Sequence, residues 1–121
     1  MSVINDSKFK KSILSALADE DMIQIIKHAT DNPISGNDII KLCNIPHSTA
    51  YRKIKWMLET ELLTIKEIKF TNDGKKYTLF QSTIHSINVN MEKGGNMIVT
   101  ATKNIGAKQF IAKRFLSMDI E

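Results

Sequence analysis

Apolar residues near the start of the chain recur every three or four positions, the spacing of one buried face on an α-helix. The two stripes consist of Phe9, Ile13, Leu14 and Leu17, and of Met22, Ile23, Ile25, Ile26 and Ala29. Asp6 or Ser7 can cap the first helix and Asp19 the second, because these side chains accept hydrogen bonds from amides of the first turn. The pattern predicts two helices, the second ending near Thr30.

A short helix, a tight break and a longer helix follow. Ser35 can cap a helix over 36–42, with an acidic side chain three residues on, as in a capping box. Asn44-Ile45-Pro46 ends that helix, because proline lacks an amide hydrogen and disfavours helix in the residue before it. A longer helix is predicted over 47–62. This order is the outline of a helix-turn-helix.

After Leu63 the apolar period changes from helical to alternating, which predicts two β-hairpins. The first turns at Asn72-Asp73-Gly74 and the second at 92–95, where glycines follow Glu92-Lys93. From Ile105 the helical spacing returns and predicts a terminal helix. The predicted fold class is therefore α+β.

Length and composition restrict the class of protein. The chain has 121 residues, of which 42% are hydrophobic and 25% charged, as in an ordinary globular domain. No apolar run approaches the roughly 20 residues that cross a bilayer, and a single cysteine, Cys43, cannot form an intrachain disulfide. We therefore expect a cytoplasmic protein that does not bind a membrane.

Segments 39–54 (IIKLCNIPHSTAYRKI) and 58–63 (LETELL) resemble the winged-helix core of ArsR-type and related archaeal transcription regulators. An apolar pair in the third helix, a small polar cluster after Pro46 and a leucine-rich exit carry the resemblance, and 80–102 looks like the extra hairpin of archaeal members. The resemblance implies a winged-helix DNA-binding domain over 1–82. A C-terminal hairpin and helix over 83–121 would pack on the same domain and serve dimerisation.

The chain departs from this family at two places. Metal-sensing members carry paired cysteines in the third helix, whereas this chain has Cys43 alone. The glycine that usually precedes the wing is replaced by Glu61 or its neighbour. His28, His47 and His85 lack the spacing of a zinc site, so we expect no metal and no cofactor.

One side of the helix over 47–62 carries hydrogen-bond donors at positions i, i+1, i+4, i+5 and i+8. These are His47, Ser48, Tyr51, Arg52 and Lys55. An arginine can bond bidentately to guanine in the major groove, so we assign Arg52 to base readout. Ser48, Thr49 and Tyr51 are assigned to phosphate or base contact and Lys55 to the DNA backbone.

Basic residues concentrate in and after this helix. From His47 to Gln81 there are seven cations and four anions, a net charge of +3 out of +4 for the whole chain. Lys53 joins the DNA-binding set, and Lys75 and Lys76 would contact phosphates electrostatically from the first hairpin. The alternative for the helix lysines and Arg52 is an ordinary solvated face.

Several residues allow a second interpretation. Tyr51 can instead pack on the first hairpin, and Trp56 fits the core or hairpin packing better than base stacking. Cys43 fits a small buried hydrophobe. The second hairpin and terminal helix could hold a small ligand or only a partner subunit.

The sequence favours a sequence-specific DNA-binding transcription regulator that acts as a homodimer on double-stranded DNA. Two apolar stripes are the predicted dimer contact: Phe110, Ile111, Phe115 and Met118 of the terminal helix, and Phe9, Ile13 and Leu17 of the first helix. The alternative function is a non-enzymatic winged-helix module that binds another protein. No phosphate-binding glycine loop, nucleophile motif or metal cluster is present, so we do not expect an enzyme.

Overall fold

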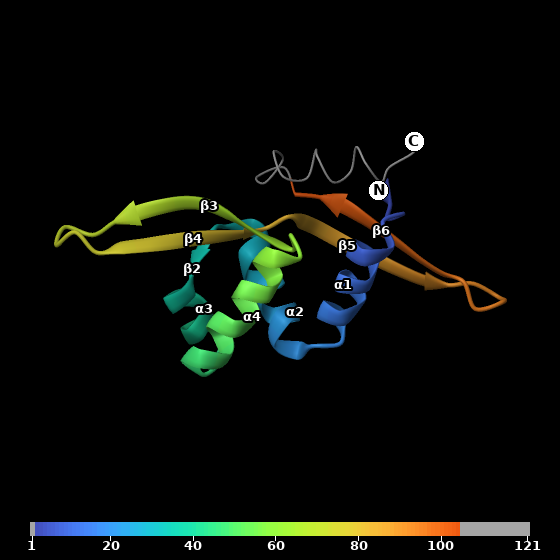
Figure 1. The fold of residues 1–121 in the computed structure, drawn as a ribbon, viewed down its shortest axis with the longest axis horizontal. Coiled ribbons are helices and arrows are strands. Elements are labelled where there is room, and N and C mark those ends of the chain that lie inside the picture. The colour runs from blue at the N-terminus through green and yellow to red at the C-terminus, as the bar shows by residue number, and fades with distance from the viewer. Residues whose placement is uncertain (1, 105–121) are drawn as a thin grey trace.

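The computed structural model describes residues 2–104 of the chain (Figure 1). This part is an α+β fold of four helices and two three-stranded antiparallel sheets. The helices are α1 (Ser7–Leu17), α2 (Glu20–Asp31), α3 (Gly36–Cys43) and α4 (His47–Glu59). The strands are β1 (Ser2–Val3), β2 (Ile34–Ser35), β3 (Leu63–Phe70), β4 (Lys76–Ser82), β5 (Ile84–Met91) and β6 (Met97–Lys103).

The first three helices begin at the predicted caps. Asp6 Oδ1 accepts hydrogen bonds from the amides of Lys8 and Phe9, at 2.9 and 3.1 Å. Asp19 accepts from the amide of Met22 at 3.0 Å, and Ser35 accepts from that of Asp38 at 3.1 Å. Each bond satisfies an amide that has no carbonyl partner within its helix. The starts of these three helices could therefore be predicted from the sequence alone.

Helix α4 ends earlier than predicted, because the chain leaves it through a left-handed residue. Glu61 has φ 66°, its amide donates to Leu58 O at 3.1 Å, and the next amide, of Leu62, donates to Met57 O at 2.8 Å. These two bonds form a Schellman motif, the usual helix ending for glycine. Glu61 occupies the position where glycine is usual, and it adopts the left-handed conformation that this helix ending requires.

A buried polar junction holds that turn in place and joins the two sheets. Thr83 Oγ1 donates to Glu61 O at 2.8 Å, and the Thr83 amide donates to Leu62 O at 3.1 Å. Asn104 Nδ2 donates to Ser82 O at 2.9 Å and to Thr30 O at 3.0 Å. The link between β4 and β5 is therefore bonded directly to the turn after α4 and, through Asn104, to the end of α2.

The sheets have the orders β2-β4-β3 and β1-β6-β5. Strand β1 has only two residues, with Ser2 opposite Ala101 and Val3 opposite Thr100, too few for an alternating pattern to predict it. The N-terminal strand therefore belongs to the same sheet as the second hairpin. Residues on both sides of position 82, including Ile4 and Val99, share one buried cluster.

The apolar face of helix α1 packs against this cluster. Phe9 and Ile13 are 2% and 0% exposed, so the prediction that they contact a second subunit is wrong: these two side chains pack inside their own chain. Leu17, at the end of the helix, remains exposed. The terminal stripe predicted over Phe110, Ile111, Phe115 and Met118 lies outside the described residues.

The two hairpins extend from the helices in opposite directions (Figure 1). In β3 only Leu63 and Thr64 are buried, and the six following residues are exposed. Strand β5 likewise becomes exposed toward its end. Each hairpin is therefore anchored at its base and projects as a two-stranded ribbon.

Replacing Glu61 tests the left-handed turn. Glu61→Gly should be more stable than Glu61→Ala by about 1 kcal/mol, because both remove the side chain but only alanine retains the penalty of positive φ. Urea unfolding of the two variants measures the difference. Equal stabilities would show that residue 61 is not left-handed.

Candidate nucleic-acid interface

Helix α4 has a packed side and an open side. Ala50, Ile54 and Met57 are 0%, 2% and 0% exposed. A rotation of about 100° per residue places the exposed residues Ser48, Arg52, Lys55 and Glu59 on the opposite side. Burial of the apolar side therefore turns a polar and mainly cationic side outward.

The turn between α3 and α4 sets where α4 begins. Asn44 is left-handed, with φ 53° and ψ 50°, and the Ile45 amide donates to Ile40 O at 3.3 Å. Ile45 is buried, so it anchors the turn to the core. Pro46 precedes α4 without a side-chain cap, and the exposed His47 and Ser48 follow it.

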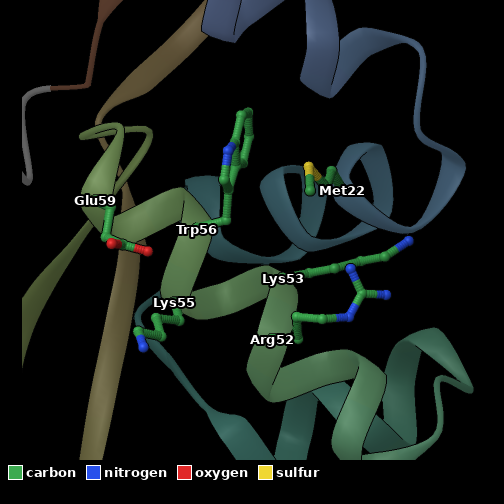
Figure 2. A pocket seen from close by; sticks show the side chains of 6 residues that line it. All are labelled: Met22, Arg52, Lys53, Lys55, Trp56 and Glu59. Carbon is green, nitrogen blue, oxygen red and sulfur yellow. The ribbon is translucent and has the colours of Figure 1, made fainter.

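The open side of α4 borders a shallow hollow of about 410 Å³ (Figure 2). Its lining consists of Met22, Arg52, Lys53, Lys55, Trp56 and Glu59. The half-buried Trp56 also packs on the core, in keeping with its predicted role. Glu59 was not singled out from the sequence as a residue of this surface, although its position seven residues after Arg52 places both side chains on one side of the helix.

Lys53 differs from its cationic neighbours. Its ammonium group lies 2.9 Å from an Asp19 carboxylate oxygen and 2.8 Å from one of Asp21, and only 12% of the side chain is exposed. We therefore correct the prediction that Lys53 binds DNA: it lies at the edge of the packed side, where α2 supplies two carboxylates. It ties α4 to the start of α2.

The ion pairs shift the titration of both partners. Hydrogen bonds from Lys53 to Asp21 and Asp19 raise the pKa of the lysine. Burial alone would raise the pKa of Asp19, but bonds from Lys53 and from the Met22 amide outweigh burial and lower it. The charged forms of both groups are thus the stable ones in the folded protein.

Tyr51 packs against the helix before it. Its ring lies 4.7 Å from that of His47, centroid to centroid, and a methyl group added at Gly36 would approach the Tyr51 hydroxyl to 2.4 Å. The glycine at the start of α3 therefore leaves room for the tyrosine. The sequence left packing on the first hairpin as an alternative to DNA contact, whereas the structure places the ring on α3, with the side chain still partly exposed.

Lys75 and Lys76 are exposed in the β3–β4 hairpin. The base of this hairpin follows α4, but its far end projects away from the helices (Figure 1). The structure thus brings His47, Ser48 and Tyr51 together with Arg52 and Lys55 on α4. It sets the hairpin lysines apart, on a separate arm.

Other candidate chemistry is limited in the described part of the chain. Cys43 is half-buried, and burial together with the charge of Asp21 raises the pKa of its thiol. Residues 2–104 contain no cluster of three metal-ligating side chains. None of their helices is long and apolar enough to cross a membrane.

Comparisons with known proteins return no match to a family model, a curated protein or a solved structure.

Replacing Lys53 tests its role in holding α4. Lys53→Met should lower the free energy of unfolding at neutral pH by about 1–2 kcal/mol, because two carboxylates lose their charged partner. Lys55→Met, an exposed lysine on the same helix, should change it by less than about 0.5 kcal/mol. Urea unfolding measures both, and similar losses would contradict the assigned role.

The same pair predicts a pH dependence. Because the pKa of Asp19 is lowered from 3.8 by folding, its stabilisation is present above pH 3.8 and is lost as the pH falls below that value. Because the pKa of Lys53 is raised from 10.5, its stabilisation is lost only above pH 10.5. Unfolding followed across pH should show a shallower decline at both extremes in Lys53→Met than in the wild type.

Proposed function

We propose that this protein is a sequence-specific DNA-binding transcription regulator with a winged helix-turn-helix, in which α4 enters the major groove as the recognition helix. The observation that carries the proposal is the division of α4 between a fully packed side and an open side that presents Ser48, Arg52 and Lys55. A major groove about 12 Å wide admits such a helix.

Each open position suits a different DNA group. Arg52 can donate two parallel hydrogen bonds to guanine O6 and N7, so we assign it to base readout. Lys55 would neutralise a phosphate. Ser48 and the free amides at the start of α4 would donate to another phosphate, because Pro46 provides no side-chain cap there.

Glu59 sets how α4 lies in the groove. It shares the open side with Arg52 but stands two turns further along, at the end of the helix. Its carboxylate repels phosphates, so the end of α4 is directed away from the backbone. Contact is therefore made by the part of α4 that precedes Glu59, from Ser48 to Lys55, and the N-terminal end of the helix enters the groove first, as in helix-turn-helix docking.

The β3–β4 hairpin is the wing in this proposal. Lys69, Lys75 and Lys76 are exposed on it, and they would bind phosphates beside the groove that α4 occupies. The separation of the hairpin from α4 in Figure 1 suits this division, because a projecting arm reaches a neighbouring stretch of backbone.

We further propose a homodimer. One recognition helix covers only a few base pairs, and paired half-sites lie about 34–36 Å apart. Since Phe9 and Ile13 are buried within the protomer, the contact is assigned to 105–121, with Leu17 as the exposed residue of the α1 stripe.

A protein-binding module is the second candidate function. Exposed Ile65, Ile68 and Phe70 on the β3–β4 hairpin favour it, because such an apolar stripe suits a protein partner. Salt separates the two functions: affinity for a DNA duplex falls steeply as salt rises, through release of counterions from the phosphates.

Selection from a random duplex pool tests the proposed function and supplies the site for further work. A palindromic consensus with two half-sites is the expected result. Wild-type protein that binds scrambled and selected duplexes equally would contradict base readout.

Two sets of variants distinguish base readout from phosphate contact. Arg52→Ala should weaken binding to the selected duplex by about 1–3 kcal/mol and reduce the preference over scrambled duplex. The double variant Lys75→Ala and Lys76→Ala should weaken binding to all duplexes, and the slope of log affinity against log salt should fall by about 1 per lost contact. Lys11→Ala, an exposed lysine of α1, is the control and should bind as the wild type does.

Removal of 105–121 tests the dimer assignment. The full chain should sediment as a dimer and the chain ending at Asn104 as a monomer that still unfolds cooperatively in urea. A shortened chain that stays dimeric would exclude the terminal segment from the contact.

A further inference from the structure

The far end of the β3–β4 hairpin exposes large apolar side chains. Phe70, the last residue of β3, is 68% exposed, and Ile68 is 47% exposed. The two lie on one face of the ribbon, since they are two residues apart and stand opposite Lys76 and Thr78. Neither is needed to fill the core.

The loop that follows Phe70 is firmly closed. The Thr71 amide donates to Lys75 O at 2.8 Å, and the Gly74 amide donates to Thr71 O at 2.9 Å. The Lys75 amide donates to Thr71 Oγ1 at 3.0 Å. Gly74, with φ 85°, takes the left-handed position that the turn requires. Phe70 is therefore presented on a preformed tip.

Positive charge surrounds this tip. Lys69, Lys75 and Lys76 are all exposed within six positions of Phe70. Glu67 and Asp73 oppose them, so the three lysines outnumber the two carboxylates and leave a net charge of +1. The apolar tip is thus bordered mainly by cations, which suits a polyanion with an apolar interior.

The second hairpin offers a direct comparison. Met91 ends β5 as Phe70 ends β3, and it is 65% exposed. Its neighbours are Asn90, Glu92 and Lys93, whose charges cancel. An equally exposed apolar side chain therefore lies there without the surrounding positive charge.

We propose that Phe70 acts as a wedge that enters the DNA minor groove and partly unstacks one base step, so that the protein bends the duplex it binds. The inference rests on the proposed function and extends it, because a wing that only binds phosphates needs no exposed phenylalanine. Apolar wedges on minor-groove proteins kink DNA in this way, and flanking lysines hold the phosphates on either side.

The test measures the bend of the selected duplex, labelled at its ends for energy transfer, with the full-length protein bound. Wild type should bend the duplex by roughly 20–90°. Phe70→Ala should bind but leave the duplex nearly straight, and Phe70→Leu should retain part of the bend. Met91→Ala is the matched control and should bend the duplex as the wild type does.

A fluorescent adenine analogue at the base step beneath the wing reports unstacking directly. Its emission should rise when wild type binds and stay at the level of free duplex with Phe70→Ala. Circular dichroism of the variant should match the wild type, since an exposed side chain is removed.

Other results would overturn the wedge. Wild-type protein that binds a straight duplex, or Phe70→Ala that bends it fully, contradicts this inference while leaving the proposed function intact. Failure to bind any duplex contradicts both. If Phe70→Ala instead lowers binding to phosphatidylserine vesicles or changes the sedimentation of the protein, with no change in bend, then Phe70 serves a membrane or a second copy.

Discussion

The packing of one side of α4 is the constraint on which the rest of the described structure depends. Ala50, Ile54 and Met57 lie in the common core, so the rotation of the helix about its axis is settled by burial of apolar surface. A helix rotated by half a turn would bury Arg52 and Lys55 without partners, at a cost of several kcal/mol per charge. The open cationic side is therefore a consequence of the core.

Polar contacts at the middle of α4 and just after its end complement this packing. Lys53, at the middle of the helix, binds the two carboxylates at the start of α2. After its end, Glu61 and Leu62 offer their carbonyls to Thr83. One element thus connects the α2 helix, the β3–β4 hairpin and the strand junction. A shift of α4 would therefore also shift the residues at the base of both hairpins.

Local elements could be predicted from the sequence because their causes are local. Asp6, Asp19 and Ser35 cap helices through bonds to amides at most three residues away, and such bonds depend on spacing alone. The two hairpins follow from alternation and from glycines at their turns. Strand β1 could not be predicted, because two residues pair with a partner about a hundred positions along the chain.

The role of each side chain at the candidate interface could be predicted only in part from the sequence. Arg52 and Lys55 lie open, as their spacing indicates, because the helical period alone places them opposite the apolar stripe. Lys53 carries the same charge in the same helix, yet its partners come from α2, more than thirty positions earlier. Tyr51 lies on α3 because Gly36 lacks a side chain there.

By itself the sequence determined where helices, turns and hairpins begin, and which side of α4 is apolar, because these depend on the chemistry of neighbouring residues. Only the tertiary structure decided that Phe9 and Ile13 are core, that Lys53 is paired, and that Phe70 stands exposed at the end of an arm. Those outcomes depend on which distant segments of the chain come into contact. The spacing of apolar residues along the sequence is the same whether their side chains pack within the chain, contact another molecule or stay exposed to water.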